Sequence, residues 1–552
     1  MKSDTSTQSH MTPEQFREMA QSAVGFVEQY WQGLQSDPER TPVFSRVKPG
    51  EVRSTLPSVF DEHASREPRA MVEEITRLIM PGITHWQHPS FFGFFPANAS
   101  GPAVIGELLA AGLGVQGMLW ATSPACTELE THVLDALGAA IGLPATFLST
   151  SENGGGVIQG TASEAVLAAL CAARWRVQKA WAIATQHKSS SGGNSPTPNP
   201  SHGEGLFAAA PPHLCLYTSS QAHSSVVKAA MIAGLAVGPE DRTHVRIIDV
   251  DADCRMRVDS LEAAMREDVA AGKVPCFVSA TVGTTGSTAI DSIREIAAAI
   301  ARTSSLRHSV TPLPLPWLHV DAAHAGAACI CPEYQCWLDG IEHADSFCFN
   351  PHKWLLTNFD CDCFWTRDRA SLIGSMSITP EYLRNKASDA GEVFDYRDWH
   401  VPLGRRFRSL KLWLTLRWYG LEGLRAYIRN HMQLAAEFEA MVRSDARFEV
   451  AAVRTMNLVC FRLKPREGET LAATDARNKA LLNAINQSGR AYLSHTALPV
   501  WEERAEGSNE ADVIGRRGSA FVLRMAIGGV FTQREHVRDA WKLMQKLAGE
   551  MK

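Results

Sequence analysis

One lysine stands where a β-sheet could present it for chemistry. Residues 350–354 read Asn-Pro-His-Lys-Trp and follow the apolar run 344–349, which predicts that Lys353 lies at the carboxyl end of a buried strand. A buried ammonium group is costly, and forming an imine with an aldehyde cofactor removes its charge while storing a reactive group. The ordinary alternative is a lysine whose stem packs on apolar surface while its head reaches water. Other residues of a cofactor site must therefore decide between the two.

Three further positions offer what pyridoxal 5′-phosphate (PLP) requires. Asp321 ends an apolar strand and could hold a pyridine nitrogen protonated, which makes the ring an electron sink. Thr161 and Ser163 open an alanine-rich helix, where N–H groups and hydroxyls could bind a phosphate, and Thr161 and Glu164 have the spacing of a capping box. His223 follows another strand and could stack on a flat ring. Each residue alone also fits a turn or a helix cap, but together they favour a PLP site with no metal.

The pattern of elements around these residues predicts an α/β fold. Short β-branched runs alternate with alanine-rich helical periods between about residues 150 and 370, which is typical of a mainly parallel sheet wrapped by helices. The expected strands are 213–218, 276–281, 317–321 and 346–349, and the expected helices are 163–182, 224–234 and 291–301. Thr284 and Thr285 follow the second strand. Ligand chemistry should gather at the strands' carboxyl ends.

Three parts are expected along the chain. Residues 1–100 contain helical patterns, such as 13–34, and should pack on another surface. Residues 101–434 should form the large PLP-binding domain. Residues 435–552 alternate strand-like runs (458–463, 521–526) with helical ones (472–487, 534–547), which predicts a small α+β domain.

Composition narrows the class of protein. The 552 residues are 45% hydrophobic, and 54 basic against 59 acidic side chains give a net charge of −5, so we expect a small-molecule ligand rather than nucleic acid. Residues 1–12 are polar and lack the pattern of a secretory signal, which favours the cytoplasm. The most apolar stretch, Ala103–Trp120, is broken by Glu107 and glycines, so we expect a buried helix and a turn, not a membrane span.

The cysteines permit one competing interpretation. Twelve cysteines in such a chain favour reduced thiols over disulfides. A zinc site could draw on Cys329, Cys331, Cys336, Cys361 and Cys363. Their C-x-C spacing and apolar neighbours favour small core residues over metal ligands.

These motifs resemble a known family. The chain is similar to the group II pyridoxal-phosphate decarboxylases, and most of all to the aromatic L-amino acid decarboxylases, from about Met11 to Leu547. The most specific matches are residues 123–130 (Ser-Pro-Ala-Cys-Thr-Glu-Leu-Glu), 154–164, 319–323, 350–356 and 403–411 (Leu-Gly-Arg-Arg-Phe-Arg-Ser-Leu-Lys). The resemblance implies the aspartate aminotransferase-like fold, PLP-dependent decarboxylation of an aromatic amino acid to the amine and CO₂, and a homodimer.

The resemblance also implies roles for individual residues. Lys353 would bind the cofactor covalently, Asp321 would pair with the ring nitrogen, and His223 would stack on the ring. The phosphate would contact Ala162, Ser163 and Asn350, and the ring side would contact Thr285. Tyr382 matches a loop tyrosine that protonates the substrate carbon after CO₂ leaves. A phenylalanine there is associated with aldehyde formation in the family, so Tyr382 favours plain decarboxylation.

The predicted substrate pocket departs from the family pattern. It consists of Trp86, Phe94, Ala97, Gln116, Met118 and Phe359. Phe94 and Ala97 replace a tyrosine and a threonine, Gln116 and Met118 replace apolar residues, and His324 replaces a tyrosine. A buried amide favours substrates with a ring hydroxyl or ring nitrogen.

Three alternatives stay open. One is another PLP reaction on the same scaffold, such as aldehyde synthesis or transamination. The second is a decarboxylase for histidine or an acidic amino acid. The third is a PLP-binding partner subunit that has lost catalysis, against which Lys353 and Tyr382 both speak.

Overall fold

Contacts within the chain divide it into two units. The computed structural model describes residues 10–57, 67–190, 213–304, 313–378, 393–501 and 516–551. The larger unit holds Ala97–Lys464 and Thr496–Val522, and the smaller unit holds Met1–Pro96, Pro465–His495 and Leu523–Lys552. All of the residues predicted to bind PLP belong to the larger unit.

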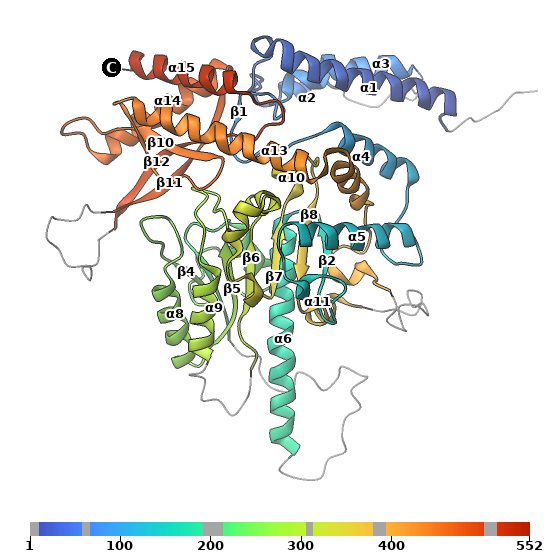
Figure 1. The fold of residues 1–552 in the computed structure, drawn as a ribbon, viewed down its shortest axis with the longest axis vertical. Helices are drawn as coiled ribbons and strands as arrows, with labels where there is room; N and C mark the ends of the chain where they lie inside the picture. The colour runs from blue at the N-terminus through green and yellow to red at the C-terminus, as the bar shows by residue number, and fades with distance from the viewer. Residues whose placement is uncertain are drawn as a thin grey trace, which may run out of the picture. The chain divides into compact units, whose positions relative to one another are not determined.

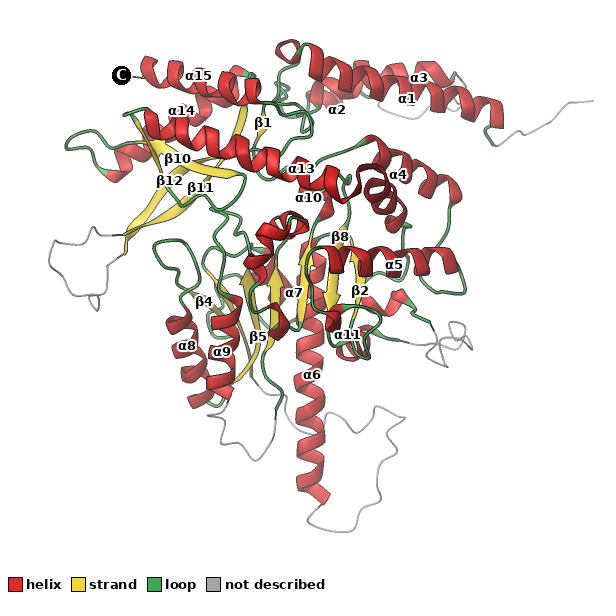
Figure 2. Cartoon of the chain, in the orientation of Figure 1, coloured by secondary structure: helices red, strands yellow, loops and turns green. Residues whose placement is uncertain are grey.

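A seven-stranded sheet lies at the centre of the larger unit, in the order β2-β8-β7-β6-β5-β3-β4 (Figures 1 and 2). The strands are β2 Gly155–Gln159, β3 Leu214–Ser219, β4 Val245–Ile248, β5 Val274–Thr281, β6 Trp317–Asp321, β7 Ser346–Phe349 and β8 Asp362–Thr366. Strands β4, β3, β5, β6 and β7 pair in parallel, whereas β8 is antiparallel to β7 and to β2. The predicted α/β fold with a mainly parallel sheet is confirmed.

The larger unit also contains helices, several of which pack on the sheet. They are α4 Gly101–Leu113, α5 Pro124–Ala140, α6 Ala162–Ser190, α7 Ser225–Ile232, α8 Val258–Ala270, α9 Ile293–Ser304, α10 Pro351–Trp354, α11 Arg369–Met376 and α13 Arg408–Ser444. Helix α6 packs on β2, β5, β6, β7 and β8, because its buried alanines allow close approach to Val157, Phe277 and Phe364. Helix α13 is interrupted at Gly420, whose φ is 61°. Short 3₁₀ turns are Ala145–Phe147, Ala325–Ile330, Pro332–Leu338, Ile341–His343 and Tyr396–Trp399.

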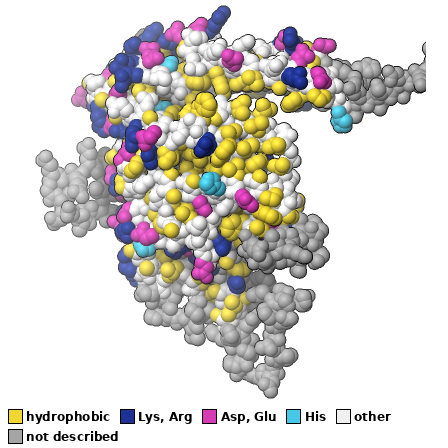
Figure 3. Space-filling model, turned by 45° about the vertical axis from the view of Figure 1, so that its right-hand side comes forward, with side chains coloured by type: hydrophobic (Ala, Val, Ile, Leu, Met, Phe, Trp, Pro, Cys, Tyr) yellow, Lys and Arg dark blue, Asp and Glu magenta, His cyan; other side chains and the backbone are white. Residues whose placement is uncertain are grey.

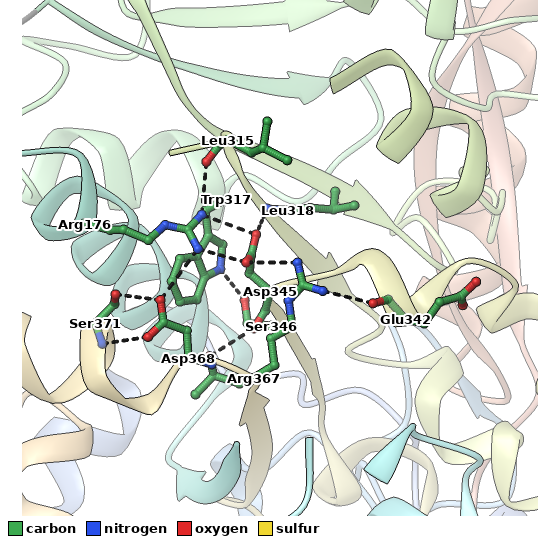
Figure 4. A network of polar contacts seen from close by, with 11 residues as sticks. Arg176, Leu315, Trp317, Leu318, Glu342, Asp345, Ser346, Arg367, Asp368 and Ser371 are labelled. Carbon is green, nitrogen blue, oxygen red and sulfur yellow. Dashed lines mark hydrogen bonds and ion pairs between the residues drawn. The ribbon is translucent and has the colours of Figure 1, made fainter. Parts of the chain in front are cut away.

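A polar network ties α6 to the amino-terminal ends of β6 and β7 (Figure 4). The Asp345 carboxylate, which precedes β7, accepts hydrogen bonds from Arg176 of α6 at 2.9 Å and from the backbone N–H of Leu318 at 2.9 Å. The Arg176 guanidinium also lies 4.6 Å from the Trp317 ring centroid. Because Asp345 is buried, loss of Arg176 would leave an uncompensated charge, so breaking this pair costs more than breaking an exposed ion pair. The network fixes the middle of α6, whose amino end lies at the predicted site.

Helix α4 differs from its prediction. The stretch 103–120 does form a helix and a turn, and the helix ends at Gly114, whose φ is 61°. It is not a buried helix, however, because Ile105, Leu108, Leu109 and Leu113 are 44–62% exposed. Among the described residues, no helix is long and apolar enough to cross a membrane.

The smaller unit is mostly helical. Its helices are α1 Pro13–Ser36, α2 Glu51–Thr55, α3 Pro68–Glu74, α14 Leu471–Ser488 and α15 Arg534–Glu550, with shorter turns at Pro38–Arg40, Ile75–Ile79 and Met80–Gly82. Thr12 and Gln15 form a capping box at the start of α1. Strand β1 Phe91–Phe92 pairs in parallel with the first residues of β11 Tyr492–Trp501.

Two strands belong to the end of the larger unit. Strands β9 Phe448–Val450 and β10 Leu458–Leu463 pair antiparallel there. Strands β11 and β12 (Arg516–Ala526) have residues in both units. The predicted strand 458–463 and the helices predicted at 13–34, 472–487 and 534–547 are confirmed within a few residues.

Candidate active site

The predicted cofactor residues follow from the sheet order. Strands β6 and β7 are neighbours, so Asp321 at the end of β6 and Lys353 after β7 lie at the same edge of the sheet. Strand β3 ends at Ser219, shortly before His223, and β2 ends shortly before α6. Parallel strands bring their carboxyl ends together, which explains why distant sequence segments meet here.

The backbone around Lys353 is held from two sides. Asn350 caps α10, and its backbone carbonyl accepts a hydrogen bond from Lys353 N at 3.0 Å. The Asn350 side-chain carbonyl accepts another from Ala162 N, the first residue of α6, at 3.1 Å. On the other side, the Asn98 amide donates to the carbonyl oxygen of Lys353 at 2.8 Å. These hydrogen bonds fix the backbone from which the half-buried Lys353 side chain extends.

Asp321 and His223 lie in one electrostatic environment with Lys353. The Asp321 side chain is buried, and one carboxylate oxygen accepts a hydrogen bond from Ala323 N at 3.0 Å. Desolvation lowers the pKa of His223, the Asp321 carboxylate opposes this, and the Lys353 ammonium lowers the pKa further. Nδ1 of His223 accepts a hydrogen bond from Ser225 N at 3.2 Å, which places the proton of the neutral ring on Nε2.

The amino end of α6 departs slightly from its predicted capping box. Helix α6 begins at Ala162, as the Thr161–Glu164 spacing predicts. The Glu164 carboxylate, however, accepts from Gly160 N at 2.7 Å rather than from Thr161 N. Ser163 is exposed and Thr161 is half-buried at this helix end, where backbone N–H groups and hydroxyls suit an anion.

The two adjacent threonines after β5 differ in environment. The Thr284 hydroxyl is buried and accepts from Ala289 N at 3.0 Å, so it stabilises the turn. Thr285 is exposed at the same turn, where its hydroxyl can reach a ligand. The exposed hydroxyl of Thr285 therefore suits a cofactor contact better than the buried hydroxyl of Thr284.

Four predicted pocket residues belong to the larger unit. Phe359 is 62% exposed, and its ring meets the His352 ring edge-on at 4.7 Å between centroids. Gln116 is exposed in the single chain rather than buried, and its side-chain carbonyl accepts a hydrogen bond from Arg405 N at 3.0 Å. This end of the amide therefore holds the main chain that leads into α13. Ala97 and Met118 are half-buried.

The remaining predicted residues lie in the smaller unit, outside the described residues or among the cysteines. In the smaller unit, the Trp86 and Phe94 rings stack at 5.5 Å between centroids. Tyr382 lies outside the described residues. Of the cysteines considered for zinc, Cys336 is exposed and the others are buried.

Sequence reasoning missed three residues that support the site. His352 is buried, and its Nδ1 accepts from Cys361 N at 2.9 Å, which links α10 to the start of β8. Burial lowers the pKa of His352 to about 3, so the ring is neutral. Glu130 and Arg405 form a buried ion pair at 2.6 Å. No spacing pattern could reveal that pair, although both residues lie in segments that resemble the family.

The residues at this edge fit PLP. Asp321 is a buried carboxylate that a pyridinium nitrogen would compensate, and Lys353 would supply the amine. The Thr281 hydroxyl, on the strand beside Asp321, is buried without a hydrogen-bond partner among the described residues. A polar ligand would satisfy such a group.

Comparisons with known proteins agree with this geometry. The model of the pyridoxal-dependent decarboxylase conserved domain matches residues 49–464. The chain is 43% identical to phenylacetaldehyde synthase of Arabidopsis thaliana and 42% identical to tyrosine decarboxylase 2 of Narcissus pseudonarcissus; each match covers 98% of this chain and 96% or 95% of the relative. The solved structure of Oryza sativa TDC with PLP and tryptamine matches with a TM-score of 0.82 and 37% identity, covering 98% of this chain and 99% of that one. The chain belongs to the pyridoxal-dependent decarboxylase family.

Proposed function

We propose that this protein decarboxylates an aromatic L-amino acid with PLP and releases the amine and CO₂. The observation that carries the proposal is the meeting of Lys353, Asp321 and the amino end of α6 at one edge of the sheet. Tyrosine decarboxylase 2 and the TDC solved with tryptamine point to aromatic substrates, since both resemble this chain over nearly its whole length.

Each residue at the edge then has a chemical task. Lys353 would hold PLP covalently through its side-chain amine. Asp321 would keep the ring nitrogen protonated, and His223 would lie against the ring. Thr161, Ala162, Ser163 and Asn350 would hold the phosphate, and Thr285 would contact the ring side. Bound PLP would supply the electron sink that decarboxylation requires. Tyr382 would return a proton to the substrate carbon.

A second candidate activity is aldehyde synthesis, because phenylacetaldehyde synthase is among the similar relatives. That reaction consumes O₂ and water and releases the aldehyde, CO₂, ammonia and hydrogen peroxide. Decarboxylation releases only the amine and CO₂. Tyr382 is the residue on which our preference for decarboxylation depends.

The products distinguish the two reactions. With L-tyrosine or L-tryptophan we expect one amine per CO₂ and no peroxide, measured by chromatography together with a peroxidase-coupled assay. The Tyr382→Phe variant should shift the products toward aldehyde, because it removes the hydroxyl proposed to return the proton to the substrate carbon. If the wild-type protein yields aldehyde and peroxide in step with CO₂, it is an aldehyde synthase.

Substrate choice within the aromatic class is also open to test. Gln116 is proposed to favour substrates with a ring hydroxyl or ring nitrogen through the N–H₂ of its side-chain amide, since its carbonyl accepts a hydrogen bond from Arg405 N. Equal turnover of phenylalanine, tyrosine and tryptophan would exclude that role. Phe94 and Ala97 lack the hydroxyls that the family has at these positions. Other groups must therefore bind the substrate carboxylate.

The protein is further proposed to work as a homodimer. The apolar face of α4 stays exposed in the single chain, and on α13 of the same unit Trp418 is 75% exposed. Figure 3 shows hydrophobic side chains gathered broadly over one face of the molecule. Exposed apolar surface of this extent is typical of association sites. In the smaller unit, Phe16 and Val24 of α1 are exposed, which supports packing of residues 1–100 on the partner subunit.

Sedimentation velocity tests the dimer. The wild-type chain should sediment with about twice its mass of 60.4 kDa. Leu108→Glu combined with Leu109→Glu should shift it to the monomer mass, because each carboxylate would be buried in the interface. Val237→Glu, at an exposed apolar residue away from α4, serves as the control and should remain a dimer. A wild-type monomer at micromolar concentration would exclude the proposal.

A further inference from the structure

A second buried aspartate lies at the cofactor edge and has no task in the proposed reaction. Asp362 is the first residue of β8 and is completely buried. Its neighbour across the ladder is Gln159, the last residue of β2, just before α6. Phe364, two residues on, is in register with Cys348, and Cys348 with Asp321. Side chains alternate along strands, so Asp362 and Asp321 face the same side of the sheet, the side that α6 covers.

The Asp362 carboxyl group has no hydrogen-bond partner among the described residues. Neither of its oxygens forms a hydrogen bond within the part of the chain that the structure describes. Asp291, another buried aspartate of this unit, differs in this respect. Its carboxylate accepts from Met256 N at 2.7 Å and from Thr281 N at 2.8 Å. A buried polar group without a hydrogen-bond partner is rare and costly. A bound ligand that forms a hydrogen bond with Asp362 would remove this cost.

Burial and the surrounding charges together influence whether the Asp362 carboxyl group is protonated. The groups that act on it are Asp321 of β6, Glu164 of α6, the adjacent Cys361 and, with opposite sign, Lys353. Burial raises the pKa of Asp362 well above its usual range, and the Asp321 carboxylate raises it further. Burial beside a second carboxylate therefore favours the protonated form of Asp362, whose O–H is a donor that needs an acceptor.

The acceptor for this O–H would lie at the first turn of α6. Gln159 leads through Gly160 to Ala162, whose N–H is bound by Asn350. Glu164, in the same turn, is among the groups that influence Asp362. We propose that Asp362 is a further cofactor-binding residue, whose carboxyl O–H donates a hydrogen bond to the phosphate of PLP at the amino end of α6. This inference rests on the proposed assignment of the phosphate to Ala162, Ser163 and Asn350.

Cofactor affinity tests the inference without any assay of turnover. The full chain, freed of cofactor, is titrated with PLP and with pyridoxal, and binding is followed by the visible absorbance of the lysine-bound cofactor. Asp362→Ala should weaken PLP binding by about 10- to 100-fold, since it removes a hydrogen bond to a charged group. Pyridoxal, which lacks the phosphate, should bind unchanged. Asp362→Asn keeps a donor and should bind PLP within about threefold of the wild type at pH 7.

The pH dependence supplies a second, independent readout. In the wild-type protein, rising pH removes the Asp362 proton, so PLP affinity should fall more steeply with rising pH than in Asp362→Asn. Asp291→Asn, the same change at a buried carboxyl away from α6, should keep the wild-type profile.

The outcomes separate this inference from the proposed function. If Asp362→Ala binds PLP as tightly as the wild type, the donor is satisfied within the protein, for example by Gln159, and the inference is wrong. If the variant weakens PLP and pyridoxal equally, Asp362 acts at the ring and the inference is again wrong. If the wild-type protein itself does not prefer PLP to pyridoxal, the proposed phosphate site fails.

Discussion

Replacement of Lys353 by alanine is expected to reduce CO₂ release from an aromatic L-amino acid by at least about 1,000-fold, because the variant loses the amine that binds the cofactor covalently. The visible absorbance of the bound cofactor should disappear as well. In the wild-type protein, reduction with borohydride followed by peptide mass spectrometry should find the cofactor on the peptide that contains Lys353. These measurements test the role of the residue separately from the fold.

A second lysine provides the control. Lys228 is exposed on α7, a few residues after His223, and Lys228→Ala should retain full activity and absorbance. Recovery of the reduced cofactor on a lysine other than Lys353 would contradict the assignment. So would CO₂ release by Lys353→Ala at more than a few percent of the wild-type rate.

Arg405→Leu is expected to lower the free energy of unfolding by about 3–5 kcal/mol, the largest stability effect we anticipate, because it leaves a buried carboxylate without its partner. Glu130 and Arg405 are both almost completely buried. Glu130 accepts from Ile158 N at 2.8 Å, and Arg405 donates to Ile158 O at 2.9 Å. The pair therefore fixes β2, which leads into the α6 end of the site. Denaturant unfolding of the cofactor-free protein measures the loss.

A double variant separates lost charge pairing from lost packing. Combining Arg405→Leu with Glu130→Leu removes both charges, so much of the lost stability should return. Arg266→Leu, which breaks an exposed ion pair with Glu262 on α8, should change stability little. The assigned role of the buried pair is wrong if the double variant is as unstable as the sum of the two single variants.

The parts of the fold with regular patterns were predictable from the sequence. Strands β6 and β7 appear with their predicted bounds, because each is a short apolar run that stops at a polar residue. Since neighbouring parallel strands end at the same edge of a sheet, these bounds alone predict that Asp321 and Lys353 lie together. Strands β2 and β8 were missed. Strand β2 begins with two glycines, and β8 begins with Asp362, a charged type of residue at a position that faces the interior.

The remainder depended on contacts that sequence patterns do not encode. Glu130 and Arg405 are 275 positions apart, and only the folded sheet brings them together. The apolar pattern of α4 suggested burial in its own chain, but the same pattern also fits a surface that a second chain covers. For Asp362, the sequence shows a carboxylate between two cysteines, and only the fold reveals that it faces α6 without a partner among the described residues.

The central claim is PLP-dependent decarboxylation of an aromatic amino acid, and CO₂ release tests it most directly. The full chain reconstituted with PLP would be supplied in turn with dihydroxyphenylalanine, tyrosine, tryptophan, 5-hydroxytryptophan, phenylalanine, histidine and glutamate. We predict release from at least one aromatic member at a rate far above that from histidine or glutamate, and none from Lys353→Ala. Absence of release from every aromatic substrate, while the cofactor's visible absorbance shows that PLP is bound, would contradict the claim.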